Sequence, residues 1–109
     1  MIYPTSDTFK TEVLEEKLPI ILDFWAEWCA PCRAMAPIFE KVAPEYEGRM
    51  KFGKVNVDEY GDLAQQSHVS SIPCLIVFYQ GQEVDRIIGL MREPDFKSRL
   101  DQILSGLKD

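Results

Sequence analysis

Helical and strand-like patterns of apolar residues alternate along the chain. Residues 6–18 carry apolar side chains at helical spacing after a capping-type start at Ser6 or Asp7, which predicts a first helix. Pro19 ends that pattern, and residues 20–26 form a short, mostly apolar run with β-branched and aromatic side chains. Such a run is typical of a strand that is buried on both faces.

A second helical pattern covers residues 32–46, and Gly48 follows it as a stop signal. Pro37 and Pro44 fall inside this segment, and each of them removes a backbone hydrogen-bond donor. We therefore expect a kinked helix that ends early, at Pro44.

The second half of the chain continues the alternation. Residues 51–57 are predicted to form a strand, and residues 58–67 a short helix. Residues 74–89 have the pattern of two strands joined by a turn at residues 80–82, which indicates an antiparallel hairpin. Residues 93–107 carry one apolar face and predict the last helix.

This order predicts an α/β fold with a mixed central β-sheet flanked by helices on both faces. Helical connections favour parallel pairing of the first strands, and the hairpin adds antiparallel pairing. A stub of strand at Ile2-Tyr3 precedes the first helix. A chain of 109 residues suffices for one hydrophobic core, so we expect a single domain, 1–109.

Composition and charge narrow the classes of function. The chain is 46% hydrophobic and 28% charged, as globular proteins are, and its net charge of −6 argues against nucleic acid or membrane as a partner. Its apolar runs are of strand length, and its first residues hold no basic segment followed by an apolar one. Three cysteines fit poorly with a secreted disulfide framework. We therefore expect a cytoplasmic protein, and we expect it to be a monomer.

Cys29 and Cys32 stand where the predicted strand 20–26 passes into the next helix. A spacing of three on a helical turn brings two side chains close enough for a disulfide. Closing so short a loop stabilises a fold by only about 2 kcal/mol, against about 4.7 kcal/mol for a loop of about 100 residues. Such a bridge is better suited to opening and closing than to holding the fold together.

The start of a helix favours a thiolate, because unpaired N–H groups and partial positive charge meet there. We expect Cys29, at or just before the first turn, to be the exposed and attacking thiol. We expect Cys32, one turn inside the helix, to be more buried, less acidic and the resolving thiol. Pro31 has no N–H and fixes φ, so it rigidifies the turn between them.

Asp23 lies inside the apolar strand and is the next candidate. A buried carboxylate without a partner is costly, and its pKa rises in response. Such an acid beneath two thiols can take a proton from the resolving cysteine and return it later. The alternative is an aspartate on a solvent-facing edge, although its neighbours leave no polar face. Lys54 is either an ion-pair or hydrogen-bond partner of Asp23 or an ordinary exposed strand lysine.

Four segments together resemble the thioredoxin family, namely "DFWAEWCAPC", "KVNVDE", "IPCLIVF" and the late "IIG". The resemblance covers nearly the whole chain and implies the thioredoxin fold and dithiol–disulfide exchange with other proteins. It implies that Cys29 is the nucleophile, Cys32 the resolving cysteine and Asp23 the buried proton acceptor. If Lys54 is the partner of Asp23, we expect it to support the proton relay. It also implies disulfide-containing target proteins and a thioredoxin reductase as partners, and no cofactor of the protein's own.

The same resemblance implies a shallow apolar groove that holds the substrate chain. The residues that match it are Trp28, Ala30, Pro31, Ile72, Pro73 and Gly89. Pro73 matches the family's cis-proline, which packs against the active-site disulfide. A second interpretation of Gly89 is a residue that simply breaks a strand.

The sequence departs from the family pattern at several positions. Ala30 stands where the family usually has Gly, and Cys74 stands where it usually has Thr. Ser67 and His68 replace what are commonly Tyr and Gly. None of these changes removes a group that the chemistry needs. Because Cys74 directly follows Pro73 in a strand, we expect it to face away from the cysteine pair, into the core.

Two other classes of function are weighed against the redox hypothesis. Cys29, Cys32, Cys74 and His68 supply four ligands, the number that a tetrahedral zinc site requires. The chain has no second CxxC and no cluster of histidines, so we expect no metal. A non-catalytic adaptor of the same fold would need neither the cysteine pair nor the buried acid. Within the redox hypothesis, the lack of a secretion signal favours a reductant over an oxidant.

Overall fold

The computed structural model describes residues 1–107. Within this part, four strands form one sheet in the order β2-β1-β3-β4. The strands are β1 (Ile20–Trp25), β2 (Lys51–Asn56), β3 (Cys74–Tyr79) and β4 (Gln82–Ile88). β1 and β2 are parallel, whereas β1 with β3 and β3 with β4 are antiparallel. The predicted mixed sheet is confirmed.

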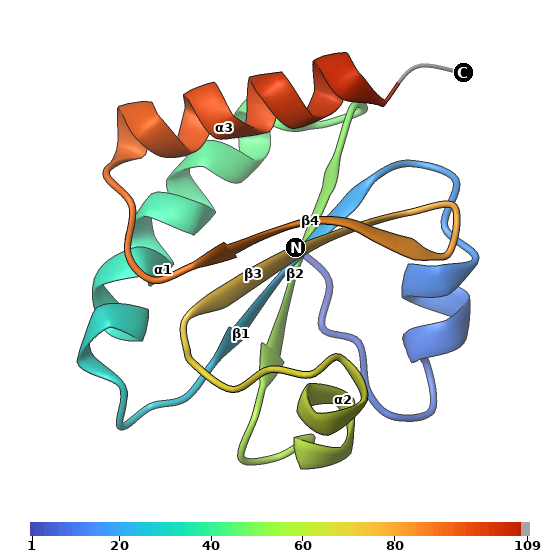
Figure 1. The fold of residues 1–109 in the computed structure, drawn as a ribbon, viewed down its shortest axis with the longest axis vertical. Helices are drawn as coiled ribbons and strands as arrows, with labels where there is room; N and C mark the ends of the chain where they lie inside the picture. Colours follow the sequence, from blue (N-terminus) through green and yellow to red (C-terminus); the bar gives the residue numbers. More distant parts are fainter. Residues whose placement is uncertain (108–109) are drawn as a thin grey trace.

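Helices cover both faces of the sheet (Figure 1). On one face, α1 (Ala30–Val42) packs against α3 (Glu93–Gly106). The other face carries α2 (Gly61–Gln66) and the short helical segment η1 (Lys10–Leu14). The predicted α/β architecture is therefore confirmed. The predicted domain, 1–109, extends two residues beyond the described part.

Each face of the sheet has its own apolar core, because successive strand residues point to opposite sides. The largest buried side chains of the core under α1 and α3 include Ile21, Phe39, Phe52, Leu75 and Phe96. Those of the core under η1 and α2 include Phe9, Leu22, Phe24, Ile76 and Phe78. β1 contributes to both cores, which explains why its sequence is almost continuously apolar.

The first helical segment begins at a different cap from the one that the sequence predicts. The Thr5 side-chain oxygen accepts hydrogen bonds from the backbone N–H groups of Asp7 (3.2 Å) and Thr8 (3.3 Å). The Thr8 hydroxyl in turn accepts from the N–H of Thr5 at 2.8 Å. This reciprocal pair holds a turn ahead of η1, whose N-cap residue is Phe9, so the expected capping-type start at Ser6 or Asp7 is wrong.

The helix that contains Cys32 starts earlier and stops earlier than the sequence pattern predicts. Cys29 is the N-cap of α1, which begins at Ala30 rather than at residue 32. α1 ends at Val42 and continues as a 3₁₀ turn, η2 (Ala43–Tyr46). Pro44 has no N–H to donate to the carbonyl four residues before it, so the α-helical ladder cannot continue there. The expected early end is confirmed.

The remaining elements follow the predicted order, and the largest shift of a boundary is at the start of α2. α2 begins at Gly61 because the Asn56 side chain accepts from the N–H groups of Asp58 and Glu59 and holds them in a turn. The hairpin turn is Gln80-Gly81, both with positive φ, the conformation that matches the twist of paired strands.

The stub of strand at the amino end is confirmed at Ile2, which forms a parallel bridge to Gly53. A side chain on Gly53 would meet Leu22 and Ile2 at 2.8 and 2.9 Å, so only glycine allows this close approach.

The register of β1 with β3 brings two distant segments together at one end of the sheet. Phe24 pairs with Cys74, so the end of β1 lies beside the start of β3. The turn from β1 into α1 holds Cys29, and the loop that leads into β3 holds Ile72 and Pro73. Cys29 and Ile72 therefore meet although they are 43 residues apart in the sequence.

Candidate active site

Cys29 and Cys32 are joined by a disulfide at the start of α1, with their Cα atoms 5.2 Å apart. Cys29 Sγ accepts a hydrogen bond from the backbone N–H of Cys32 at 3.2 Å. Pro31 lies in the first turn, where its missing N–H costs no helical hydrogen bond. The Cys29 sulfur thus occupies the place of a capping oxygen, where an N–H donor and the positive end of the helix favour a negative charge.

Both sulfurs are enclosed in this disulfide-bonded form. Cys29 is 5% exposed and Cys32 is 2% exposed, so the expectation of an exposed Cys29 is wrong for the oxidised protein. The two residues pack with Ala26, and the partly buried side chains of Val57 and Ile72 lie against this small cluster. The sequence pattern missed this cover because Val57 and Ile72 belong to other elements.

The loop before β3 approaches the disulfide directly. The Ile72–Pro73 peptide bond is cis, as the family resemblance implies, and the Ile72 carbonyl oxygen lies 3.7 Å from Cys29 Sγ. Gly89 N–H donates to the Pro73 carbonyl at 2.9 Å, with a φ of +94°. A Cβ at Gly89 would meet no atom within 4 Å, so the positive φ, rather than crowding, favours glycine there.

The rim of the site is apolar and exposed. Trp28 is 69% exposed, and its ring N–H donates to Asp58 Oδ2 at 3.0 Å. Ala30 and Pro31 are also exposed beside the disulfide. Sequence reasoning missed Asp58 as the partner of Trp28. A signal was present, because Asp58 follows β2, and the carboxyl ends of the parallel strands β1 and β2 meet at the same edge of the sheet.

Exposed apolar side chains also flank Gly89. Ile88 is 61% exposed and Leu90 is 51% exposed. The backbone hydrogen bond between Gly89 and Pro73 brings this segment to the disulfide end of the sheet. Apolar groups exposed beside a buried reactive pair are typical of a surface that binds another chain.

Asp23 is fully buried, as its apolar neighbours predict. Neither of its carboxyl oxygens has a hydrogen-bond partner among the described residues. Burial raises the pKa of Asp23 to about 6, while the charge of Lys54 lowers it and that of Glu40 raises it. The carboxyl group of Asp23 therefore changes between its protonated and ionised forms at a pH close to neutral.

Lys54 is the cross-strand neighbour of Asp23, but its direct contacts are with other groups. Its ammonium donates to Glu40 Oε2 at 3.0 Å and lies 5.0 Å from the centre of the Trp25 ring. It acts on Asp23 through charge rather than through a bond. Sequence reasoning missed Glu40, whose more exposed carboxylate pairs with Lys54 at a smaller loss of hydration than a fully buried one.

Cys74 is a free thiol, 1% exposed, in the core under η1 and α2. Burial raises the pKa of this thiol, which keeps it protonated. The expectation that Cys74 points into the core is confirmed, and Cys74 and the cysteine pair belong to separate clusters. The four ligands considered for zinc are thus not gathered, and residues 1–107 contain no group of three or more potential metal ligands.

A disulfide that closes a four-residue segment at the head of a helix can open and close without unfolding the chain. The class that the fold and this site define is a dithiol–disulfide oxidoreductase. A family model for thioredoxin matches residues 1–102, and the chain belongs to the thioredoxin family.

Individual relatives agree with this assignment. The sequence is 43% identical over 100 residues to thioredoxin 1 of Nostoc sp., with 92% of this chain and 94% of the relative covered. It is 41% identical over 97 residues to a thioredoxin of Synechocystis sp., with 89% and 91% covered. It is 38% identical over 99 residues to a chloroplastic M-type thioredoxin of Chlamydomonas reinhardtii, with 91% and 71% covered. The protein is thus a protein-disulfide reductase with a redox-active Cys29–Cys32 pair.

Proposed function

We propose that Cys29 is the attacking thiolate and Cys32 the resolving thiol of the reductase reaction. The hydrogen bond from the Cys32 N–H to Cys29 Sγ at the start of α1 is the observation that carries this assignment. That donor and the positive end of the helix favour a negative charge on the Cys29 sulfur. Cys32 lies inside the first turn and is the more enclosed of the two.

The reaction consists of two thiol–disulfide exchanges. The Cys29 thiolate attacks one sulfur of the target disulfide, forms a mixed disulfide and releases the second target sulfur as a thiolate. Cys32 then loses its proton and attacks Cys29 Sγ, which forms the Cys29–Cys32 bond and releases the first target sulfur. Two electrons have passed to the target, and its two thiolates take up protons. A reductase returns two electrons to the oxidised pair.

Asp23 is the proposed acceptor of the Cys32 proton. With a pKa of about 6 it is mostly ionised at neutral pH, yet basic enough to take up a proton during the exchange. It lies in β1, the strand that leads directly into the cysteine pair. Lys54 supports the relay because its charge favours the ionised form of Asp23.

The target chain is proposed to lie across the rim of the disulfide. The proposed contact residues are Trp28, Ala30, Pro31, Ile72, Pro73 and Gly89. The exposure of Trp28 and the 3.7 Å approach of the Ile72 carbonyl to Cys29 Sγ support this surface. A target disulfide bound against Ile72 would be held beside the sulfur that attacks it.

The wider setting is proposed on the same basis. The family implies disulfide-containing target proteins and a reductase partner in general terms, and we propose a thioredoxin reductase for the second. Among residues 1–107, no helix has the length and apolar content needed to cross a membrane. We propose a cytoplasmic monomer of one domain that needs no cofactor of its own and binds neither nucleic acid nor membrane.

Single cysteine variants test the assignment of the two thiols. Cys32→Ser should accumulate mixed disulfides with insulin through Cys29, because the resolving step is missing. Cys29→Ser should form almost none and should react slowly with iodoacetamide at neutral pH. Intact-mass spectrometry and alkylation rates measure both effects. Equal alkylation rates for the two variants would show that the helix start does not distinguish the thiols.

A further inference from the structure

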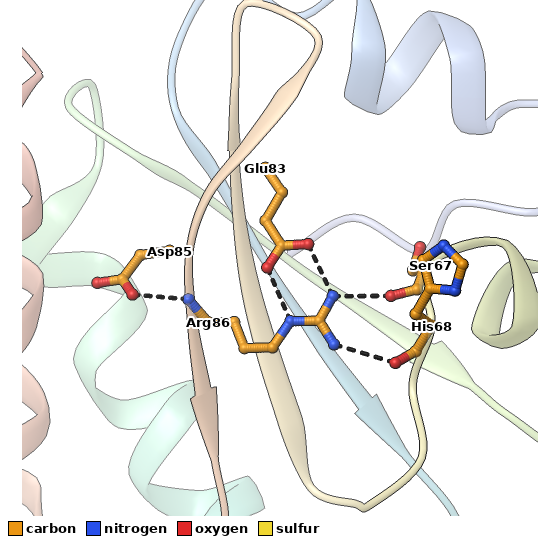
Figure 2. Close-up of polar contacts among 5 residues, drawn as sticks. All are labelled: Ser67, His68, Glu83, Asp85 and Arg86. Atoms are coloured by element: carbon orange, nitrogen blue, oxygen red, sulfur yellow. Dashed lines mark hydrogen bonds and ion pairs between the residues drawn. The ribbon is translucent and has the colours of Figure 1, made fainter.

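Arg86 of β4 lies outside the disulfide site, yet its guanidinium group is one of the most fully engaged in the molecule. Its Nε and Nη2 donate to the two carboxylate oxygens of Glu83, each at 2.7 Å. Nη2 also donates to the Ser67 carbonyl at 2.7 Å, and Nη1 donates to the His68 carbonyl at 3.1 Å. Figure 2 shows the guanidinium between the carboxylate on one side and the two carbonyls on the other.

The two carbonyls belong to the end of α2. Ser67 is the C-cap residue of that helix, and His68 follows it with a φ of +57°. Carbonyls at a helix end have no partner within the helix, and a positively charged donor suits them. A residue other than glycine keeps a left-handed conformation only where its surroundings hold it. Arg86 supplies such a hold on the His68 carbonyl from the neighbouring strand.

The chain leaving His68 runs directly into the proposed substrate-binding loop. Four residues further on lies Ile72, whose carbonyl oxygen is 3.7 Å from Cys29 Sγ. The far end of this loop is anchored by the hydrogen bond from the Gly89 N–H to the Pro73 carbonyl, 2.9 Å long. Arg86 lies near the end of β4, and Gly89 directly follows that strand, so the two residues are only three positions apart. One short segment therefore holds both ends of the loop.

We propose that Arg86 is a positioning residue, which fixes the loop 69–72 so that Ile72 is presented correctly to a target chain bound at Cys29. This inference rests on the proposed role of Ile72 and Pro73 in binding the target. The fork geometry is essential to it, because one edge of the planar guanidinium binds Glu83 while the other reaches two successive carbonyls. A lysine has the charge but cannot make that pattern of bonds.

The chain provides a matched control in Arg99. Its guanidinium binds Asp85 with two hydrogen bonds of 3.1 and 3.0 Å, on the opposite face of the same strand. Its side chain is 35% exposed, comparable with 23% for Arg86. Its other hydrogen bond goes to the Arg86 carbonyl, so among the described residues it bonds to β4 and not to the loop 67–73. Replacing either arginine therefore removes a two-bond ion pair with a carboxylate of β4, but only replacement of Arg86 also removes the bonds to the Ser67 and His68 carbonyls.

Reduction of insulin, with dithiothreitol as the electron source, tests the proposal. We expect Arg86→Gln and Arg86→Lys to raise the KM for insulin by about five-fold, with kcat changed by less than about two-fold. Reduction of dithiobis(nitrobenzoate), a small disulfide that needs no extended surface, is followed with pre-reduced protein freed of dithiothreitol, because dithiothreitol reduces this compound directly. Its rate should change by less than about two-fold in the same variants. Arg99→Gln should leave both reactions near those of the parent.

Hydrogen exchange gives a second measurement that does not depend on turnover. Amide exchange at residues 69–72 and at Gly89 should be faster in the Arg86 variants and unchanged in Arg99→Gln. A KM and an exchange pattern equal to those of Arg99→Gln would overturn the proposal. So would failure of both Arg86 variants to fold, because Arg86 would then act on the whole domain. If the parent itself did not reduce insulin, the proposed function would fail instead, which separates the two conclusions.

Discussion

Asp23 and Asp85 are aspartates on the same face of one sheet, and their environments are opposite. Each pairs across the ladder with a β3 residue of the core under α1 and α3, Asp23 with Leu75 and Asp85 with Val77. Asp85 accepts two hydrogen bonds from Arg99, which lowers its pKa. Asp23 is fully buried without a hydrogen-bond partner among the described residues, and burial raises its pKa to about 6.

The difference shows where this fold tolerates an unfavourable charge. Asp85 lies on the edge strand, where its ion pair also covers backbone groups of Arg86 that would otherwise be open to another strand. Asp23 lies on a central strand that leads into the redox-active cysteines. A carboxylate that a counter-ion neutralised there could not serve as a proton acceptor near neutral pH. The destabilising arrangement is thus found at the chemical site, and the stabilising one at the edge.

Replacement of Asp23 by Asn should have the largest effect. Because the folded pKa lies above the unfolded one, the charge of Asp23 destabilises the fold above about pH 4, and the cost is complete above about pH 6. Asp23→Asn should therefore raise the free energy of unfolding at pH 8 by about 3 kcal/mol, with little gain at pH 3. Insulin reduction should slow about ten-fold or more, because the proposed proton acceptor is lost. Urea unfolding at the two pH values and turnover at pH 7 measure these effects.

Asp85→Asn is the matched control, and its effect on stability should have the opposite sign. A lowered folded pKa stabilises the fold above the unfolded pKa, and this contribution is lost as the pH falls through the folded value. Asp85→Asn should cost about 1 kcal/mol at pH 8 and progressively less in acid, with insulin reduction nearly unchanged. If both variants lost stability at pH 8, the charge of Asp23 would have to be stabilised by a partner, and the contrast between the two aspartates would be wrong.

The Cys74→Ala variant tests whether a buried thiol outside the disulfide cluster takes part in the reaction. Cys74 is as buried as the active-site cysteines but belongs to the core under η1 and α2 rather than to the small cluster around the disulfide. We expect insulin reduction within a few-fold of the parent and a loss of about 1 kcal/mol of stability from the small cavity. Peptide mapping of the oxidised parent should find Cys29 bonded to Cys32 and Cys74 free. A disulfide that contains Cys74 would contradict the separation of the two clusters.

Lys54→Met should have the smallest effect and would sharpen the comparison. The variant removes the charge that lowers the pKa of Asp23, so that pKa should rise further and the pH profile of turnover should move to higher pH. Lys51→Met is the control, since Lys51 lies on the same strand but pairs with Glu16. Carboxyl-carbon NMR titration of Asp23 measures the shift directly. An unchanged Asp23 titration in Lys54→Met would exclude the proposed support of the proton relay.

The sequence by itself determined the elements and much of the chemistry. Periods of 3.6 and 2 residues are local properties, so they located the first two strands, the hairpin and the helices to within a few residues. The unbroken apolar run around Asp23 predicted its burial, because no face of that strand could meet water. Alternation along β3 likewise predicted that Cys74 faces the core. The errors in the elements lie at their boundaries, where single side chains such as those of Thr5 and Asn56 hold the turn that precedes a helix.

Only the tertiary structure decided which groups meet across elements. Lys54 pairs with Glu40 of α1 rather than with Asp23, and Cys29 is covered although its place at a helix start suggested exposure. The hydrogen bonds from Arg86 to the carbonyls at the end of α2 have no signature in the sequence either. For Lys54 and Arg86, several partners of suitable charge were available along the chain. Packing of whole helices and strands sets the distances among them, and at a few ångströms those distances decide which pair forms.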